Sequence, residues 1–466
     1  MSKINSDVLY LIFEEVRDDK ETLHSCLLVN KTWCELIIPI LWRNPWKYLE
    51  MENEKFLLNV IISHLSDESK NNLKSQCTAN ILKNPYQKRP LFNYISFCRH
   101  LNLNGIQRIT NFLHEKSDIS IIQNEIFNLF INSKNKFTHL YIPRQFNYQI
   151  HLIPEAKHCF SEIEFLSFYT NINDNILDGL IEICKSIKEL VLLIGYYYNN
   201  YRIVNLIEIQ EKLLNVRFLT YYDNYLAHDK SFCKILEGSL IKHANTIQYF
   251  KTVKPLTTKI LSSFVNLKVL ELDGNYFDPL NCLKNLSNLS LPLLQNLKAK
   301  FVSIEVLINL IENTSGYLDE INIDYTFYDE ISNKKIIQTI YQNCPNLKYL
   351  KLLLMNCNIL ELEKLLINCQ YLDGLHISNT RDDIFNWDNL FEILTKSSPI
   401  SLFKFKFNNY HTTPKLDSLK LFFDNWKGRH PMLLQFYRIG IYNDVIHLIR
   451  KYEFINISKY DCNDFY

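Results

Sequence analysis

Cysteine and histidine are the residues of this chain whose chemistry could serve catalysis or metal binding. The sequence holds 12 cysteines and 13 histidines. No two cysteines form a Cys-x-x-Cys pair and the histidines are dispersed, so no metal-ligand spacing appears. The sequence also has no Gly-x-Ser-x-Gly elbow, no phosphate-binding glycine loop and no His-Glu-x-x-His motif. We therefore expect a protein that is not an enzyme and that holds neither a metal nor a cofactor.

The charge balance narrows the classes of partner. There are 51 basic and 50 acidic residues, which gives a formal net charge of +1. No overall electric field favours nucleic acid or an anionic membrane, so we expect neither as a partner. Apolar runs such as Leu36 to Trp42 are far shorter than the roughly 18 residues of a membrane-spanning helix. Since Met1 opens no signal peptide and the cysteines read as reduced thiols, we expect a cytoplasmic or nuclear protein.

The remaining possibility is a binding function, which requires strands or helices that present side chains to a partner. From about residue 91 a pattern repeats: an apolar residue, two variable residues, a central apolar residue, one variable residue and usually another apolar one. The repeat period of 20 to 31 residues resembles that of leucine-rich repeats. A strand and a helix in each repeat predict an α/β horseshoe solenoid. The central residues are Leu140, Leu166, Leu190, Leu219, Phe250, Leu270, Leu297, Ile321, Leu350, Leu375, Phe405 and Phe436, with Leu101 in a first copy.

The variable positions beside each central residue should point away from the core, because side chains alternate along a strand. Aromatic residues there are typical of binding hot spots. Lysines make the second half of this face basic, so we hypothesise that it binds a target protein through an acidic or phosphorylated segment. The alternative is that lysine and tyrosine only keep exposed strands soluble. The candidate residues are Phe165, Phe218, Tyr249, Lys251, Lys298, Tyr349, Lys351, Lys404 and Lys406.

The first forty-odd residues predict a compact all-α module. Ser6 is the expected N-cap, and Asp7 in the first turn suits the positive end of the helix dipole. Apolar residues recur at helical spacing as far as Val16 and again from Leu23 onward, with a charged turn between.

This arrangement resembles an F-box, the module that docks substrate receptors onto a Skp-type adaptor of a cullin–RING ubiquitin ligase. The family usually opens with Leu-Pro, whereas this chain has Ile4 and Asn5, and loss of the proline's rigidity should weaken adaptor binding. The resemblance is carried by Val8, Leu9, Ile12, Phe13, Leu23, Cys26, Val29 and Trp33. It implies that the residues facing the adaptor are Val8, Leu9, Ile12, Phe13, Leu27, Val29 and Trp33.

The resemblance implies an F-box at residues 1–45, a helical linker at 46–90, leucine-rich repeats at 91–450 and a tail at 451–466. The protein would then be the substrate-recognition subunit of a Skp–cullin–F-box ubiquitin ligase, in which the repeats bind the protein to be ubiquitinated. The alternative is a leucine-rich-repeat scaffold outside any ligase, whose N-terminal helices only cover the end of the solenoid core.

Overall fold

The computed structural model describes residues 5–76, 90–111, 116–195, 198–220, 229–274, 289–324, 329–379, 385–408, 413–437, 448, 451–452 and 455–457. The chain divides into two compact units, residues 1–213 and 214–466. In both units parallel strands alternate with helices along the chain.

The first unit begins with three short helices, α1 (Ser6–Glu15), α2 (Lys20–Leu27) and α3 (Lys31–Trp42). A side-chain oxygen caps the start of each helix by accepting a hydrogen bond from a main-chain N–H. The three caps are Asn5, Asp19 and Asn30, which accept from Asp7, Thr22 and Trp33 at 3.2, 3.0 and 2.9 Å. The prediction of Ser6 as N-cap is therefore wrong by one residue, and Asn5, in the place where proline was expected, caps α1.

The next helices of the first unit are α4 (Glu54–Ser63) and α5 (Asp67–Gln76), which follow the 3-10 turn η1 (Met51–Asn53). Within the predicted linker at 46–90, residues 51–63 and 67–76 are helical. The linker packs on the first repeats: α4 lies against α7 (Leu103–Thr110) and α5 against α8 (Lys116–Phe130). Glu54, itself buried, pairs with Arg108 across the first contact. These helices cover the end of the repeat core.

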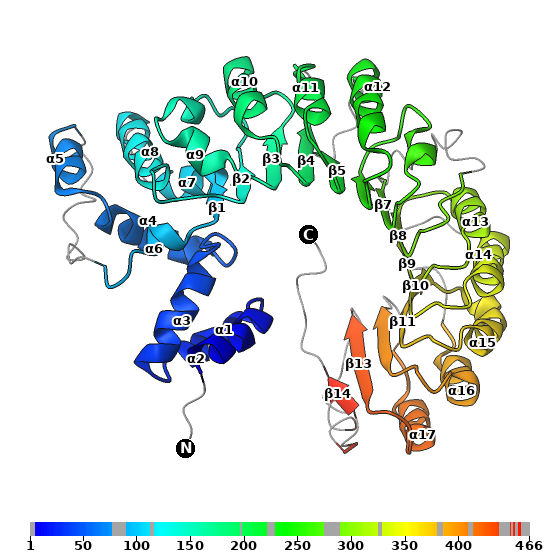
Figure 1. The fold of residues 1–466 in the computed structure, drawn as a ribbon. Coiled ribbons are helices and arrows are strands. Elements are labelled where there is room, and N and C mark those ends of the chain that lie inside the picture. Colours follow the sequence, from blue (N-terminus) through cyan, green and yellow to red (C-terminus); the bar gives the residue numbers. More distant parts are fainter. Residues whose placement is uncertain are drawn as a thin grey trace. The chain divides into compact units, whose positions relative to one another are not determined.

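The strands of the first unit are β1 (His100–Asn102), β2 (His139–Tyr141), β3 (Phe165–Tyr169) and β4 (Glu189–Ile194), parallel and adjacent in chain order. The helix side carries α9 (Ala156–Phe160), α10 (Asp174–Ile183) and α11 (Ile203–Glu208) (Figure 1), and η3 (Ile150–Leu152) contacts α9 and α10. The short helix α6 (Tyr94–Phe97) precedes β1 and contacts α3 and α8.

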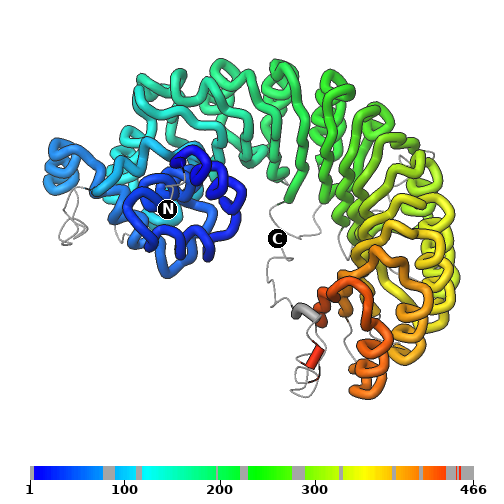
Figure 2. The backbone as a smooth tube through the Cα atoms, turned by 60° about the horizontal axis from the view of Figure 1, so that its bottom comes forward, coloured from blue at the N-terminus to red at the C-terminus, as the bar shows by residue number. Residues whose placement is uncertain are grey.

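The second unit continues the same repeat, with strands along one side and helices along the other (Figures 1 and 2). Its strands are β5 (Asn215–Thr220), β6 (Tyr249–Thr252), β7 (Val269–Asp273), β8 (Asn296–Lys300), β9 (Glu320–Asp324), β10 (Tyr349–Leu353), β11 (Gly374–Ser378), β12 (Lys404–Asn408), β13 (Met432–Tyr437) and β14 (Ile455–Ile457). Its helices are α12 (Lys230–Ser239), α13 (Ile304–Glu312), α14 (Glu330–Asn343), α15 (Ile359–Asn368), α16 (Trp387–Ser397) and α17 (Leu416–Trp426), with 3-10 turns η4 (Leu240–His243), η5 (Ile260–Ser263) and η7 (Asn356–Asn358). The last strand, β14, pairs with β13 beyond the predicted end of the repeats at residue 450.

One apolar residue from each of the strands β5 to β13 forms a continuous row in the core. Adjacent members are register partners and all are at most 1 % exposed. Each repeat therefore covers the apolar side chain that its neighbour contributes to the core. The row is Val216, Phe250, Leu270, Leu297, Ile321, Leu350, Leu375, Phe405 and Leu434.

A main-chain ladder also joins the repeats, just before the strands. The carbonyl oxygen of Gln248 accepts hydrogen bonds from Lys268 and Val269, at 2.8 and 3.0 Å. Lys268 in turn accepts from Gln295 and Asn296 in the next repeat. The pattern recurs at Gln295, Asp319, Lys348 and Asp373.

The row corrects two predicted central residues. Val216, and not Leu219, pairs with Phe250, and Leu434, and not Phe436, pairs with Phe405. The sequence around β5 fits the apolar pattern in two registers three residues apart. An odd shift moves every side chain to the opposite face. Phe218, predicted to face a target protein, is therefore in the core and only 3 % exposed.

Candidate functional site

The three-helix module of α1 to α3 carries an apolar surface that its own core does not use. Its core consists of Leu9, Phe13, Leu23, Ile37 and Ile40. Outside this core, five large apolar side chains at the start of the chain are exposed by 47 to 80 %. They are Val8, Leu11, Ile12, Leu28 and Val29.

The predicted adaptor-facing residues thus fall into three groups. Val8, Ile12 and Val29 are exposed, as a docking surface requires. Leu27 and Trp33 are half-buried against the module core, and Trp33 meets the Phe13 ring edge-on at 5.1 Å. The prediction is wrong for Leu9 and Phe13, which are 7 % and 2 % exposed because they point into the core between the helices. Leu11 and Leu28 are exposed residues that the prediction missed.

An ion pair ties α1 to the end of α3. The Arg43 guanidinium donates hydrogen bonds to the Glu14 carboxylate, one of them at 3.0 Å, and to the Tyr10 hydroxyl at 3.1 Å. The hydrogen bonds from Arg43 lower the pKa of Glu14, although partial burial opposes this. Next in the chain, the buried Trp46 donates to the carbonyl oxygen of His100 at 2.9 Å, which fixes the module to β1.

On the strands of the first unit, Phe165 belongs to a stack of rings. His139 stacks on Phe165 at 5.1 Å, and His100 stacks on His139 at 3.7 Å. Burial lowers the pKa of both histidines, to about 3 for His100. Along the sequence the histidines are dispersed. His100 and His139 nevertheless share one position, each directly before the central leucine of its repeat, and this shared position is the signal that could have predicted their contact.

In the second unit, the lysines of β6 to β9 alternate with acids. Lys251 pairs with Glu271 at 3.1 Å, and Glu271 also meets Lys298 at 3.7 Å. Lys298 reaches Glu320 on the next strand at 3.8 Å. The Tyr249 ring contacts the cation of Arg217, 4.9 Å from the guanidinium carbon. The predicted basic strip is therefore wrong for these strands, because each lysine lies beside a carboxylate. Lys251, Glu271 and Lys298 each directly follow the central residue of their repeats, so the repeat alignment itself was a signal for this pairing.

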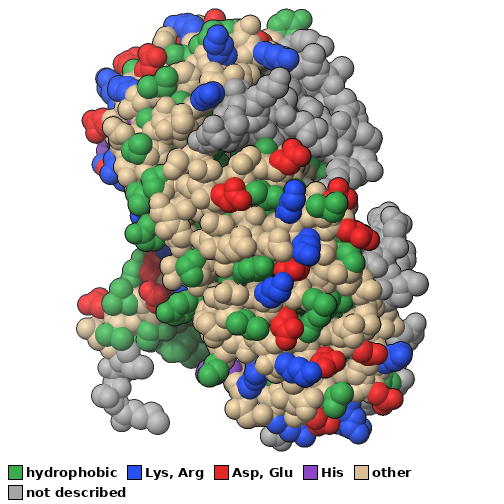
Figure 3. Space-filling view, turned by 90° about the vertical axis from the view of Figure 1, so that its right-hand side faces the viewer, with side chains coloured by type: hydrophobic (Ala, Val, Ile, Leu, Met, Phe, Trp, Pro, Cys, Tyr) green, Lys and Arg blue, Asp and Glu red, His purple; other side chains and the backbone are tan. Residues whose placement is uncertain are grey.

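The remaining candidates lie on β10 to β12. Register brings Tyr349 beside Gly374 and Gly374 beside Lys404. Two residues further along the strands, Lys351 and Lys406 flank His376. The structure therefore gathers Tyr349, Lys351, Lys404 and Lys406 on three neighbouring strands. The helix side of the second unit mixes charges of both signs with scattered apolar side chains (Figure 3).

Three further features of the described residues concern metal binding, membrane spanning and the cysteine thiols. Among the described residues, no group of three or more His, Cys, Asp or Glu side chains is placed to hold a metal ion. No helix in the described part is both long and apolar enough to cross a bilayer. Burial raises the pKa of the thiols of Cys98, Cys184, Cys344 and Cys369 to about 12.

The strand register and the repeated strand–helix unit define an α/β protein of the leucine-rich-repeat type. Similar solved structures include the leucine-rich repeat-containing protein LegL7 from Legionella pneumophila, with 14% identity and a TM-score of 0.37 over 62% of this chain and 89% of that one. Another is a chain of the Drosophila Toll–Spatzle complex, with 13% identity and a TM-score of 0.33 over 68% of this chain and 46% of that one. No family model matches the sequence. No curated protein matches it either.

Proposed function

We propose that the chain is the substrate-recognition subunit of a Skp–cullin–F-box ubiquitin ligase. In this role α1 to α3 dock a Skp-type adaptor and the strand face of the repeats binds the target protein. The chain breaks no bond itself, and contributes by holding the target near the ubiquitin-charged enzyme.

One observation supports the docking role. The helices α1 to α3 bury their own five-residue core and still expose Val8, Ile12 and Val29. The end of the repeat core is covered by α4 and α5, which pack on α7 and α8. Because other helices cover this end, the module is not needed as a cap, and its exposed apolar residues favour a protein partner.

The alternative, a repeat scaffold outside any ligase, also has an observation in its favour. Trp46, just after α3, packs on Gly105 of α7 and donates to His100 of β1. The module is thereby joined to the first repeat as a terminal cap would be. The two functions differ in whether a Skp-type adaptor binds.

Co-purification of the full chain with a Skp-type adaptor tests the proposal. Substituting both Ile12→Asp and Val29→Asp should remove a stable complex, because each buries a charge in an apolar interface at a cost of about 2 kcal/mol or more. The matched control is Leu360→Asp with Ile400→Asp, which places two acids on exposed apolar positions elsewhere. Absence of a complex with the unsubstituted chain, or a complex that survives Ile12→Asp and Val29→Asp, would favour the scaffold.

A further inference from the structure

Three neighbouring strands of the second unit, β10 to β12, concentrate positive charge on the side away from the helices. On each strand, three alternate residues lie on this side, and all nine of them are described by the structure. None of the nine is acidic. Three of them are lysines. The nine are Tyr349, Lys351, Leu353, Gly374, His376, Ser378, Lys404, Lys406 and Asn408.

The acids that contact Lys351 and Lys404 come from outside the three strands. Asp324, at the end of β9, pairs with Lys351, and Asp373, just before β11, lies 3.5 Å from Lys404. The positive field nevertheless reaches β11, because Lys351 and Lys406 add to burial in lowering the pKa of His376 to about 3. On β6 to β9, by contrast, carboxylates stand on the strands themselves, between the lysines.

Gly374 shapes the centre of this surface. A Cβ atom at this position would lie 2.6 Å from Cδ2 of Tyr349 and 3.6 Å from Cβ of Lys404. The Tyr349 ring therefore occupies the space that any larger residue on β11 would fill. The result is an aromatic ring that has Lys404 beyond Gly374 on one side, Lys351 two residues along its own strand and Glu320 of β9 on the other side. The ring and the two lysines combine an apolar contact with cations.

We propose that Tyr349, Lys351, Lys404 and Lys406, here called the lysine patch, bind an anionic segment of the target protein, rich in carboxylates or phosphorylated. The inference rests on the proposed role of the repeats in target binding, and it names the chemistry of the target. Lysines contact carboxylate and phosphate oxygens alike. An anionic segment meets no acid on the three strands themselves and competes with Asp324 and Asp373 only at their margin. On β7 to β9 it would meet Glu271 and Glu320 on the strands, between the lysines.

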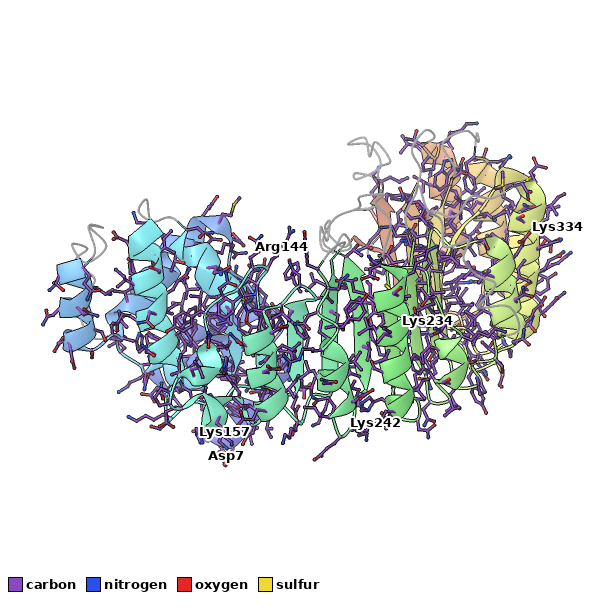
Figure 4. The ribbon with its side chains drawn as sticks, turned by 90° about the horizontal axis from the view of Figure 1, so that it is seen from above. Asp7, Arg144, Lys157, Lys234, Lys242 and Lys334 are labelled. Carbon is purple, nitrogen blue, oxygen red and sulfur yellow. The ribbon has the colours of Figure 1, made fainter. Side chains whose placement is uncertain are left out.

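Fluorescence anisotropy with labelled peptides tests this inference on the full chain. The probes are an oligoglutamate, a phosphoserine peptide of the same length and a neutral Gly-Ser peptide. Replacing Lys351, Lys404 and Lys406 together by Gln should weaken binding of the tighter anionic probe by about tenfold. The matched control replaces three lysines on the helix side by Gln and so removes the same charge. They are Lys234, Lys242 and Lys334, which lie on α12, η4 and α14 (Figure 4). It should change affinity by less than about twofold, since distant charges are screened.

Two results would overturn the inference: anionic probes that bind no better than the neutral one, or equal weakening by both triple substitutions. The preferred anionic probe identifies the source of the negative charge. If the patch triple variant does not fold, Lys404→Gln with Lys406→Gln provides the same comparison. Adaptor co-purification of the same variants keeps the two proposals separate, because the peptide assay needs no adaptor.

Discussion

The main-chain carbonyl oxygen of Arg43 accepts a hydrogen bond from the N–H of His100 at 3.2 Å. It also accepts from Arg99 at 2.9 Å, and the carbonyl of Arg99 accepts in the same way from Thr138 and His139. The residue that closes α3 is therefore the first member of the repeat ladder. Because its guanidinium holds Glu14 of α1, Arg43 connects the three-helix module to β1 through both its side chain and its main chain.

Replacing Arg43 by Met should make the module less stable at neutral pH and less sensitive to acid. Its pairing lowers the folded-state pKa of Glu14 below the ordinary 4.5. The stabilisation is therefore present above that pH and is lost as pH falls through the folded pKa. We expect a loss of about 1–3 kcal/mol at neutral pH that shrinks near pH 3, measured by urea unfolding. Arg17→Met is the control. Arg17 is exposed and its nitrogen is as far as 4.0 Å from the Glu14 carboxylate, so this substitution should lower the free energy of unfolding by less. An equal loss at both pH values would contradict this account.

Phe13→Ala should unfold the module rather than only remove a docking contact. Phe13 is 2 % exposed and packs edge-on against Trp33. Removing such a ring costs about 3–5 kcal/mol. Val8→Ser, at an exposed position of the same helix, should leave the free energy of unfolding nearly unchanged. Chemical unfolding followed by tryptophan fluorescence measures both, and similar stability of the two variants would place Phe13 on the surface instead.

The sequence predicted the elements better than their faces. Leucine at regular intervals sufficed to predict the parallel strands and the helices between them. The spacing of Val8, Leu9, Ile12 and Phe13 predicted a helix but could not say which residues face its partners, because an apolar docking surface extends the same stripe as an apolar core. Phe218 was misplaced for a related reason, since two registers satisfied one pattern. Lys298 and Glu271 each directly follow the central leucine of their repeats, so their pairing could have been predicted by comparing neighbouring repeats instead of counting lysines alone.

Gly105→Ala should loosen the contact between Trp46 and the first repeat. A Cβ atom at residue 105 would lie 2.5 Å from Cε3 of the buried Trp46 ring. Alanine normally favours a helix by up to about 1 kcal/mol over glycine, so net destabilisation of about 1–3 kcal/mol would report the clash. Trp46→Leu should reduce that penalty in the double variant. If Gly105→Ala instead raises the thermal midpoint, the Trp46 ring has room to move.

His376 should make the second unit less stable in mild acid. Its pKa falls from 6.5 to about 3 because of burial and of Lys351 and Lys406. Below about pH 6.5 the unfolded chain takes up a proton that the folded chain does not, so stability declines from that pH down towards the folded pKa. Each pH unit should cost about 1.4 kcal/mol, which gives about 2 kcal/mol at pH 5. His376→Asn should remove this part of the decline in urea unfolding at pH 5 and 7.5, whereas His430→Asn serves as the control. Identical pH dependence of the variant and the unsubstituted chain would contradict the assignment.

The carbonyl ladder also bears on how such a chain can change over generations. Because successive repeats are joined at the residue before each strand, the number of residues on the helix side is not fixed by the joint. Adding residues to a loop there costs little closure entropy. One repeat can therefore gain or lose residues by mutation while the strands on either side keep their alignment, which accounts for an array whose units differ in length yet stack as one series.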